Sequence, residues 1–197
     1  MNSRANIAVM ISGRGSNLSA LIDACKSDNY PAKIVKVISD QSNAAGLDIA
    51  RSAGIFAIAL ERKDYLSKSE HEAAILDELE TVKPDLICLA GFMRILSAMF
   101  ISRYPGKILN IHPSLLPKYP GLNTHQRVLD AGDNIHGCSV HLVEEALDAG
   151  PIIAQAVVNV DPHDDEQSLA GKVLKVEHEL YVGAVRKVLR EKKASQR

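Results

Sequence analysis

The sequence predicts an α/β protein with an open, mostly parallel, Rossmann-like sheet, helices on both faces and an antiparallel pair of strands near the C-terminal end. Short apolar runs alternate with segments of helical periodicity through the first half, an order that gives a parallel sheet with right-handed crossovers. The run 86–90 is apolar without interruption, which is typical of a parallel strand covered on both faces. The segments 137–143 and 152–160 flank a short acidic loop and favour a hairpin-like antiparallel pair.

The elements of the first half follow directly from hydrophobic patterning. The first strand, 6–11, is apolar and ends at a glycine-containing turn. Leu18, Leu21, Ile22 and Cys25 then recur at the spacing of one helix face. The remaining elements of this half are predicted as strand 33–39, helix 44–53, strand 55–60, helix 65–82 and strand 86–90.

The second half of the chain has longer loops and a long final helix. Its predicted elements are strand 107–111, helix 125–131, strands 137–143 and 152–160, and a helix whose apolar stripe runs from Leu169 to Val188. The polar tail 191–197 is predicted to be frayed. We expect a single domain, 1–197, with an N-terminal half of about 1–105 and a C-terminal half of about 106–190.

The composition excludes several classes of protein. The 197 residues include 23 Lys and Arg against 24 Asp and Glu, a net charge of −1, so no positive field over the whole protein attracts nucleic acid. No apolar run approaches the roughly 20 residues that a membrane helix needs. The three cysteines lie far apart without a CxxC pair, which argues against a disulfide framework or a zinc–thiolate site and favours a cytoplasmic location.

The turn Ser12–Asn17, with sequence SGRGSN, is the first candidate binding site. Glycines let backbone N–H groups approach a ligand, and the following helix N-terminus favours a phosphate. The alternative is a plain tight turn in which Ser16 caps the helix. A dinucleotide-binding fingerprint is incomplete, because Leu18 occupies the third glycine position, although Asp40 stands where a ribose-binding acid would.

The end of the strand 107–111 carries the second candidate site. Asn110 and His112 are two residues apart, so their side chains point to the same side of the strand. Ligands of open α/β sheets bind at this carboxyl edge. An amide beside an imidazole can stabilise a developing oxyanion, and the imidazole can also transfer a proton. The alternative is a structural loop with a hydrogen-bonded histidine.

Two further loops are candidates for the same site. Asp148 lies in an acidic loop that Gly150 and Pro151 restrain, and beside His112 its charge would favour the protonated imidazole. The apolar segment Ala90–Leu96 follows a buried strand and either walls a pocket for a flat aromatic ligand or packs beneath the next helix. We expect no metal site, because neither HE pair of the sequence extends to HExxH.

Four segments of the chain resemble the phosphoribosylglycinamide formyltransferases, also called glycinamide ribonucleotide transformylases. They are Ile11–Leu18 (ISGRGSNL), Leu89–Ser97 (LAGFMRILS), Leu109–Gly121 (LNIHPSLLPKYPG) and His136–Ile153 (HGCSVHLVEEALDAGPII). The resemblance implies the formyltransferase fold, with substrate bound by the N-terminal half and folate by the C-terminal half. It implies transfer of a formyl group from 10-formyltetrahydrofolate to the amine of 5-phosphoribosylglycinamide, in de novo purine (IMP) synthesis.

The resemblance also assigns roles to residues of this sequence. Asn110, His112 and Asp148 match the family's catalytic trio. The implied substrate-binding residues are Gly15, Ser16 and Asn17 for the phosphate and Glu177 for the ribose hydroxyls. The implied folate-binding residues are Lys68, near the folate tail, with Met93, Arg94, Ile95, Leu96, Asn110, Glu144, Glu145, Ala146, Leu147 and Asp148.

The expected partners are therefore the two small-molecule substrates, without nucleic acid, membrane or metal, and the expected assembly is a monomer or homodimer. Two other functions share these features. One is a formyltetrahydrofolate hydrolase, in which water replaces the amine. The other is a non-catalytic folate- or nucleotide-binding protein that keeps the pocket.

Overall fold

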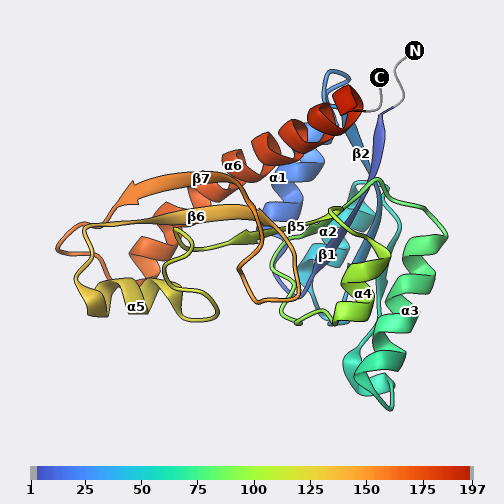
Figure 1. The fold of residues 1–197 in the computed structure, drawn as a ribbon, viewed down its shortest axis with the longest axis horizontal. Coiled ribbons are helices and arrows are strands. Elements are labelled where there is room, and N and C mark those ends of the chain that lie inside the picture. The colour runs from blue at the N-terminus through green and yellow to red at the C-terminus, as the bar shows by residue number, and fades with distance from the viewer. Residues whose placement is uncertain (1–3, 196–197) are drawn as a thin grey trace.

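The computed structural model describes residues 4–195 and contains one seven-stranded sheet in the order β3-β2-β1-β4-β5-β6-β7 (Figure 1). The strands are β1 (Ala5–Ile11), β2 (Ala32–Ser39), β3 (Ala57–Ala59), β4 (Leu86–Leu89), β5 (Ile108–His112), β6 (Ile135–Leu142) and β7 (Ile152–Asn159). The first five strands are parallel, whereas β6 is antiparallel to β5 and β7 is antiparallel to β6. The predicted fold class, including the antiparallel pair, is confirmed.

Helices cover both faces of the sheet (Figure 1). They are α1 (Ser16–Cys25), α2 (Ala45–Ser52), the 3₁₀ turn η1 (Arg62–Asp64), α3 (Lys68–Glu80), α4 (Ala98–Arg103), α5 (Thr124–Ala131) and α6 (Glu166–Ser195). Within the described residues, none of these helices is both long and apolar enough to cross a membrane.

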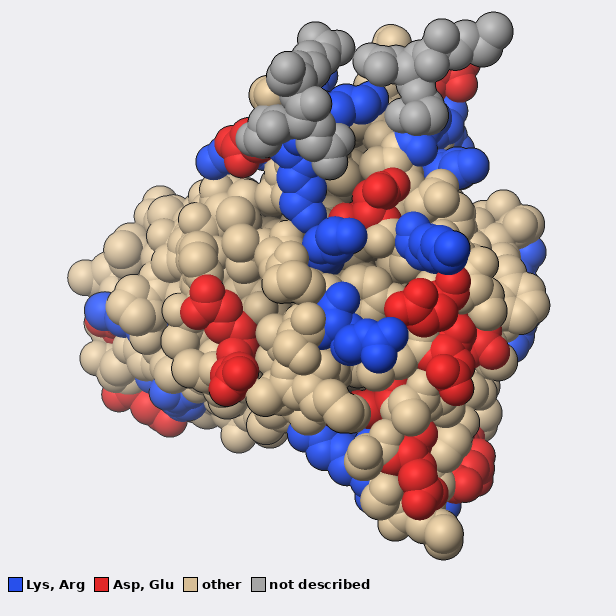
Figure 2. Space-filling view, turned by 45° about the vertical axis from the view of Figure 1, so that its right-hand side comes forward, with Lys and Arg blue, Asp and Glu red and all other residues tan. Residues whose placement is uncertain are grey.

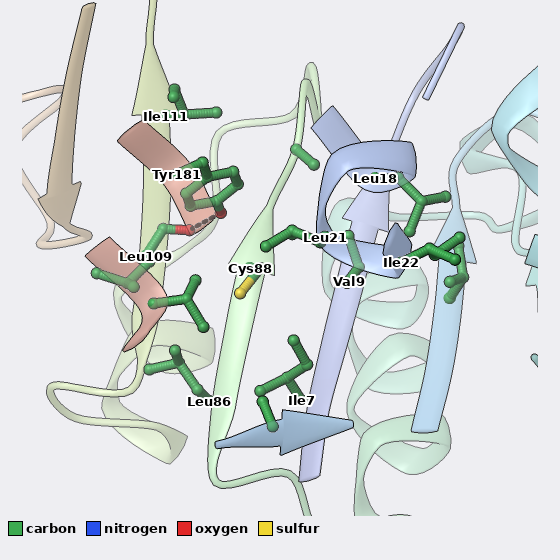
Figure 3. Packing of buried hydrophobic residues seen from close by; sticks show 14 of the residues in the cluster. Ile7, Val9, Leu18, Leu21, Ile22, Leu86, Cys88, Leu109, Ile111 and Tyr181 are labelled. Carbon is green, nitrogen blue, oxygen red and sulfur yellow. Dashed lines mark hydrogen bonds between the residues drawn. The ribbon is translucent and has the colours of Figure 1, made fainter. Parts of the chain in front are cut away.

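The alternation of side chains along β1 builds two hydrophobic cores. Ile7, Val9 and Ile11 pack against α1, α2 and α6 on one face of the sheet. Figure 3 shows Ile7 and Val9 among the residues of this core. Ala8 and Met10 point to the other face, where α3 and α4 cover them. All five side chains are fully buried, so both faces of this strand exclude water. The uninterrupted apolar pattern of the parallel strands follows from this double burial.

The final helix joins the two halves of the sheet. Tyr181 of α6 is fully buried, and its hydroxyl lies 3.0 Å from the carbonyl oxygen of Leu89 and 3.2 Å from that of Leu109 (Figure 3). These carbonyls belong to β4 and β5. The helix therefore packs directly behind the strand ends that carry the candidate site.

Three predicted element bounds are wrong. The strand expected over 55–60 is limited to β3, and the helix expected over 65–82 begins only at Lys68, where Ser67 caps it by accepting a 3.1 Å hydrogen bond from the N–H of Glu70. Helix α6 continues to Ser195, where a frayed tail was expected from residue 191, because its apolar face stays packed against the sheet as far as Leu189. Residues 196–197 of that tail lie outside the described residues.

One helix, α4, was not predicted. It has six residues, too few for hydrophobic periodicity to be detected. The hydroxyl of Ser97 caps it by accepting a 3.2 Å hydrogen bond from the N–H of Phe100.

Candidate active site

A cavity of about 430 Å³ opens at the carboxyl ends of β4 and β5. Its walls are the loop 91–96, the segment 121–125 and the loop 143–148, together with Glu166 of α6. The cavity lies at the edge of the sheet where open α/β proteins bind ligands. The apolar segment after β4 both packs in the core and lines the cavity: Phe92 and Leu96 are buried, whereas residues 93–95 are exposed along the cavity wall.

Asn110 and His112 both line this cavity, as their spacing in β5 predicts. His112 is only 5 % exposed. Asp148 reaches the imidazole from the loop after β6, and its Oδ2 lies 3.4 Å from His112 Nδ1. The three side chains that the sequence singled out therefore lie together.

Several contacts hold Asp148 in its ionised form. Burial is the largest single influence and works to raise the pKa of Asp148, but His141, the Gly121 N–H and the charge of His112 together lower it. The Gly121 N–H donates to Asp148 Oδ2 at 2.8 Å, and His141 Nε2 lies 3.6 Å from Oδ1. Asp148 itself has a positive φ of 51°, which is uncommon for a residue other than glycine and belongs to the turn of this loop.

The tautomer of His112 follows from its second contact. Nε2 lies 2.9 Å from the carbonyl oxygen of Tyr119, which can only accept a hydrogen bond, so Nε2 carries a hydrogen. Nδ1 is then the nitrogen that gains or loses a proton, and it is the nitrogen that faces Asp148. An imidazolium in this position donates to the Tyr119 carbonyl through Nε2, and its charge lies 3.4 Å from the Asp148 carboxylate oxygen on the Nδ1 side.

His141 is a site residue that the sequence analysis did not identify. It stands opposite Asn110 in the pairing of β5 with β6, and its Nε2 lies 3.2 Å from Asn110 Nδ2. Its Nδ1 lies 2.8 Å from the carbonyl oxygen of Leu142 and carries a hydrogen, so Nε2 is the nitrogen shared between Asn110 and Asp148. The contact fixes which way the Asn110 amide points. The alternation of side chains along a strand places His141 on the same face as Ser139, and this pattern could have marked His141 as a candidate.

Glu166 and His125 also line the cavity and were not predicted. Nδ1 of His125 lies 2.9 Å from Nε2 of His136, so one imidazole donates to the other. Burial, followed by the charge of the other imidazoles, lowers the pKa of His136 to about 4. Burial is also the main cause that lowers the pKa of His125. The pair is therefore neutral near pH 7.

The turn before α1 presents free backbone N–H groups. Gly15, with φ of 77°, is the N-cap residue of α1, so no side chain caps this helix. Ser16 is the first helical residue. The alternative in which Ser16 caps the helix is therefore wrong. A Cβ on Gly15 would lie 2.6 Å from the Cα of Gly46, which only glycine avoids. The helix N-terminus consequently stays open to an anion.

The first and last helices meet at this turn. Asn17 is 8 % exposed, and its Nδ2 donates to Glu177 Oε2 at 2.8 Å. The Oδ1 of Asn17 is buried without a hydrogen-bond partner. Burial raises the pKa of Glu177, and the hydrogen bond from Asn17 opposes it. The two residues that the resemblance assigned to one substrate are thus in direct contact.

The loop 91–96 is anchored to the ends of β1 and β2. The N–H of Met93 donates to Ser12 Oγ at 2.8 Å, and Arg94 Nε donates to Asp40 Oδ2 at 2.6 Å. The interpretation of Asp40 as a dinucleotide-binding acid is wrong, because its buried carboxylate holds Arg94 instead.

The other predicted folate residues lie at the rim. Glu144–Leu147 form an exposed part of the cavity wall. Lys68 lies outside this cavity and lines a neighbouring one of about 320 Å³, which shares the residues Phe92–Leu96 with it. Lys68 Nζ is 3.7 Å from the buried carboxylate of Glu72. Within residues 4–195, no group of three or more His, Cys, Asp or Glu side chains could hold a metal ion.

The family model described as formyl transferase matches residues 5–185. The chain belongs to the formyl transferase family. This formyl transferase is 48 % identical over 176 residues to the phosphoribosylglycinamide formyltransferase of Escherichia coli (strain K12), covering 89 % of this chain and 83 % of the relative. Its fold matches the crystal structure of phosphoribosylglycinamide formyltransferase from Brucella melitensis with a TM-score of 0.92 and 54 % identity, covering 95 % and 96 % of the two chains.

A second solved structure agrees with the first. The crystal structure of glycinamide ribonucleotide transformylase 1 from Symbiobacterium toebii matches this formyl transferase with a TM-score of 0.93 and 40 % identity, covering 95 % of this chain and 89 % of that one. The resemblance that the four sequence segments indicate is therefore confirmed, as is the assignment of the chain as an enzyme that transfers a formyl group.

Proposed function

We propose that this formyl transferase moves the formyl group of 10-formyltetrahydrofolate to the amine of 5-phosphoribosylglycinamide, giving formylglycinamide ribonucleotide and tetrahydrofolate in purine synthesis. The observation that carries the proposal is the convergence of Asn110, His112 and Asp148 on one cavity between two anchored loops. The similarity to proteins named for this reaction, over about nine-tenths of the chain, supports it.

The glycine turn is the proposed site for the substrate phosphate. Gly15, Ser16 and Asn17 supply N–H groups at an uncapped helix N-terminus, which suits a phosphate dianion. Glu177 is the proposed acceptor for ribose hydroxyls, since its carboxylate lies beside this turn and has one protein hydrogen bond. The substrate site then includes Glu177 of α6, which lies outside the proposed substrate half of about 1–105.

The cavity is the proposed folate site. Its walls are mainly apolar with few polar groups, which suits a flat heterocycle. One wall consists of Met93, Arg94, Ile95 and Leu96, and the other of Glu144–Asp148. Lys68, in the adjoining cavity, is the proposed contact for the anionic tail of folate. The proposed folate half of about 106–190 accordingly shares its pocket with the loop 91–96.

The proposed chemistry starts when the substrate amine attacks the formyl carbon, which forms a C–N bond and an oxyanion. His112, protonated at Nδ1 and facing the carboxylate of Asp148, donates to that oxyanion. The Asn110 amide has one N–H on His141 and a second N–H free for the oxyanion. The carbon–N10 bond then breaks, the amine loses one proton and the N10 of folate gains one, through His112 or water.

Partners and location follow as part of the same proposal. We expect a monomer or homodimer in the cytoplasm that binds its two small substrates but neither nucleic acid nor membranes. Three free cysteines suit a reducing compartment. On the face seen in Figure 2, acidic side chains directly border the basic ones, an arrangement that does not favour a polyanion.

A spectroscopic formyl-transfer assay tests the function. We expect loss of 10-formyltetrahydrofolate only when 5-phosphoribosylglycinamide is present, with equal amounts of the two products. Formate release without the amine would identify a hydrolase instead. Tight binding of both ligands with no turnover would identify a non-catalytic binding protein.

A further inference from the structure

The carbonyl group that orients His112 belongs to a strained loop. Tyr119, whose carbonyl oxygen accepts from His112 Nε2, has a φ of 56°, which costs a non-glycine residue about 1 kcal/mol. The buried hydroxyl of Ser114 also contacts this oxygen, at 3.1 Å. A backbone conformation of this kind persists only where its surroundings hold it.

The side chain of Tyr119 supplies such a restraint. Its hydroxyl donates to Asp133 Oδ2 at 2.8 Å, and the same oxygen accepts from Lys118 Nζ at 2.8 Å. The guanidinium of Arg127 lies over the tyrosine ring at 5.4 Å and donates to the Pro120 carbonyl at 2.6 Å. The hydrogen bond to Asp133 is the main cause that raises the pKa of the Tyr119 hydroxyl. The loop is thus fixed on both sides of the carbonyl that His112 uses.

We propose that Tyr119 is a positioning residue for His112: its hydroxyl, bound to Asp133, holds its own carbonyl on His112 Nε2, so that proton exchange takes place at Nδ1. The proposal rests on the function proposed above, because it takes His112 as the group that exchanges a proton during formyl transfer. Tyr119 and Asp133 lie outside the cavity lining, and the direct link from Tyr119 to the site is the hydrogen bond from His112 Nε2 to its carbonyl oxygen. Without this restraint, the neutral ring is free to hold its hydrogen on either nitrogen.

The pH dependence of His112 involves every titratable group that faces it. Asp148 and His141 approach from the loop after β6 and from β6 itself, and His125 and His136 interact with it electrostatically from α5 and β6. None of these four groups contacts the Tyr119 hydroxyl in the described part of the chain. A substitution that removes only that hydroxyl therefore leaves the charges around His112 unchanged.

Tyr119→Phe is the test variant, since it keeps the ring and the backbone. We expect kcat to fall roughly three- to tenfold, the effect of losing one hydrogen bond, with the KM of either substrate nearly unchanged and with a displaced pH profile of kcat. Tyr30→Phe is the matched control: it also removes one tyrosine hydrogen bond, 2.9 Å to the Val182 carbonyl, far from the cavity. The control should lose stability but keep the wild-type kcat and pH profile.

Asp133 provides a second set of variants. Asp133→Asn keeps an acceptor for the tyrosine hydroxyl and should lie close to the wild type, whereas Asp133→Ala should lower kcat at least as far as Tyr119→Phe does. In the Asp133→Ala background, Tyr119→Phe should have almost no further effect, because the hydrogen bond is already absent.

A measurement without substrate separates this proposal from the proposed function. The ¹⁵N chemical shifts of the His112 ring, assigned by comparison with His112→Gln, report which nitrogen holds the hydrogen. We expect the Nε2–H form in the wild type and in Tyr30→Phe, and a mixture of both forms in Tyr119→Phe. A folded Tyr119→Phe protein with the wild-type ring shifts and pH profile overturns the proposal. If the wild type transfers no formyl group, the proposed function is refuted, but the ¹⁵N shifts of the His112 ring still test whether Tyr119 orients it.

Discussion

The substitution Asp148→Asn removes the negative charge beside His112 and little else. Asparagine keeps an oxygen that can accept from the Gly121 N–H, and it tolerates the positive φ of this position at least as well as aspartate. The fold should therefore survive, so a change in activity reports on the charge.

The size of the effect follows from the distance. Opposite unit charges 3.4 Å apart attract each other by about 5 kcal/mol at an effective dielectric constant of about 20. The cost of removing both groups from water offsets part of this attraction. If roughly 3 to 4 kcal/mol of this attraction favours the protonated imidazole that donates to the oxyanion, its loss lowers the reactive fraction of the enzyme, and with it kcat, roughly 100- to 1,000-fold.

Steady-state kinetics of formyl transfer measure this loss. Asp28→Asn is the matched control, because it makes the same substitution at an exposed position outside the cavity lining. We expect the control to retain the wild-type kcat. A folded Asp148→Asn protein with kcat within about threefold of the wild type, a difference below 1 kcal/mol, would refute the electrostatic role of Asp148.

Three further predictions follow from the same site. Replacing His112 or Asn110 with Ala should lower kcat about 100- to 1,000-fold, since each change removes a proposed oxyanion donor; near-normal turnover in single-turnover assays would contradict this. Asn17→Ala should raise the KM for the phosphorylated substrate about tenfold and leave the KM for the folate unchanged, as initial rates at varied substrate would reveal. The pKa of Asp148 is lowered in the folded protein, so the stability it contributes is complete above the usual value of 3.8 and is lost as the pH falls below it. Urea unfolding should therefore show a gap between wild type and Asp148→Asn at pH 6 that narrows in acid, and a gap independent of pH would count against the lowered pKa.

Patterns of short range predicted much of this molecule. Alternation of apolar runs with helical periodicity gives the parallel sheet, and the period of two within one strand brings Asn110 and His112 to the same side. Both depend only on neighbours along the chain. The same reasoning places the glycine turn before α1 at the carboxyl edge of β1.

Contacts between distant segments set the rest. His141 was missed because its partner, Asn110, is fixed by the register between β5 and β6, which no local pattern specifies. Asp148 was identified only as a candidate, since its approach to His112 depends on a positive φ within its loop. Asp40 was misread because its partner, Arg94, lies 54 residues away. Side chains whose role is to hold a loop in place carry no motif of their own.

The pairing of Asn17 with Glu177 has a consequence for how the protein comes into being on the ribosome. The two side chains are 160 residues apart, one in the first helix and one in the last. A growing chain whose sheet has already assembled still lacks the carboxylate at its glycine turn until α6 has been synthesised and Tyr181 has inserted behind β4 and β5. A nascent or prematurely terminated polypeptide would thus lack one member of the proposed substrate site, which is complete only once the last helix has formed.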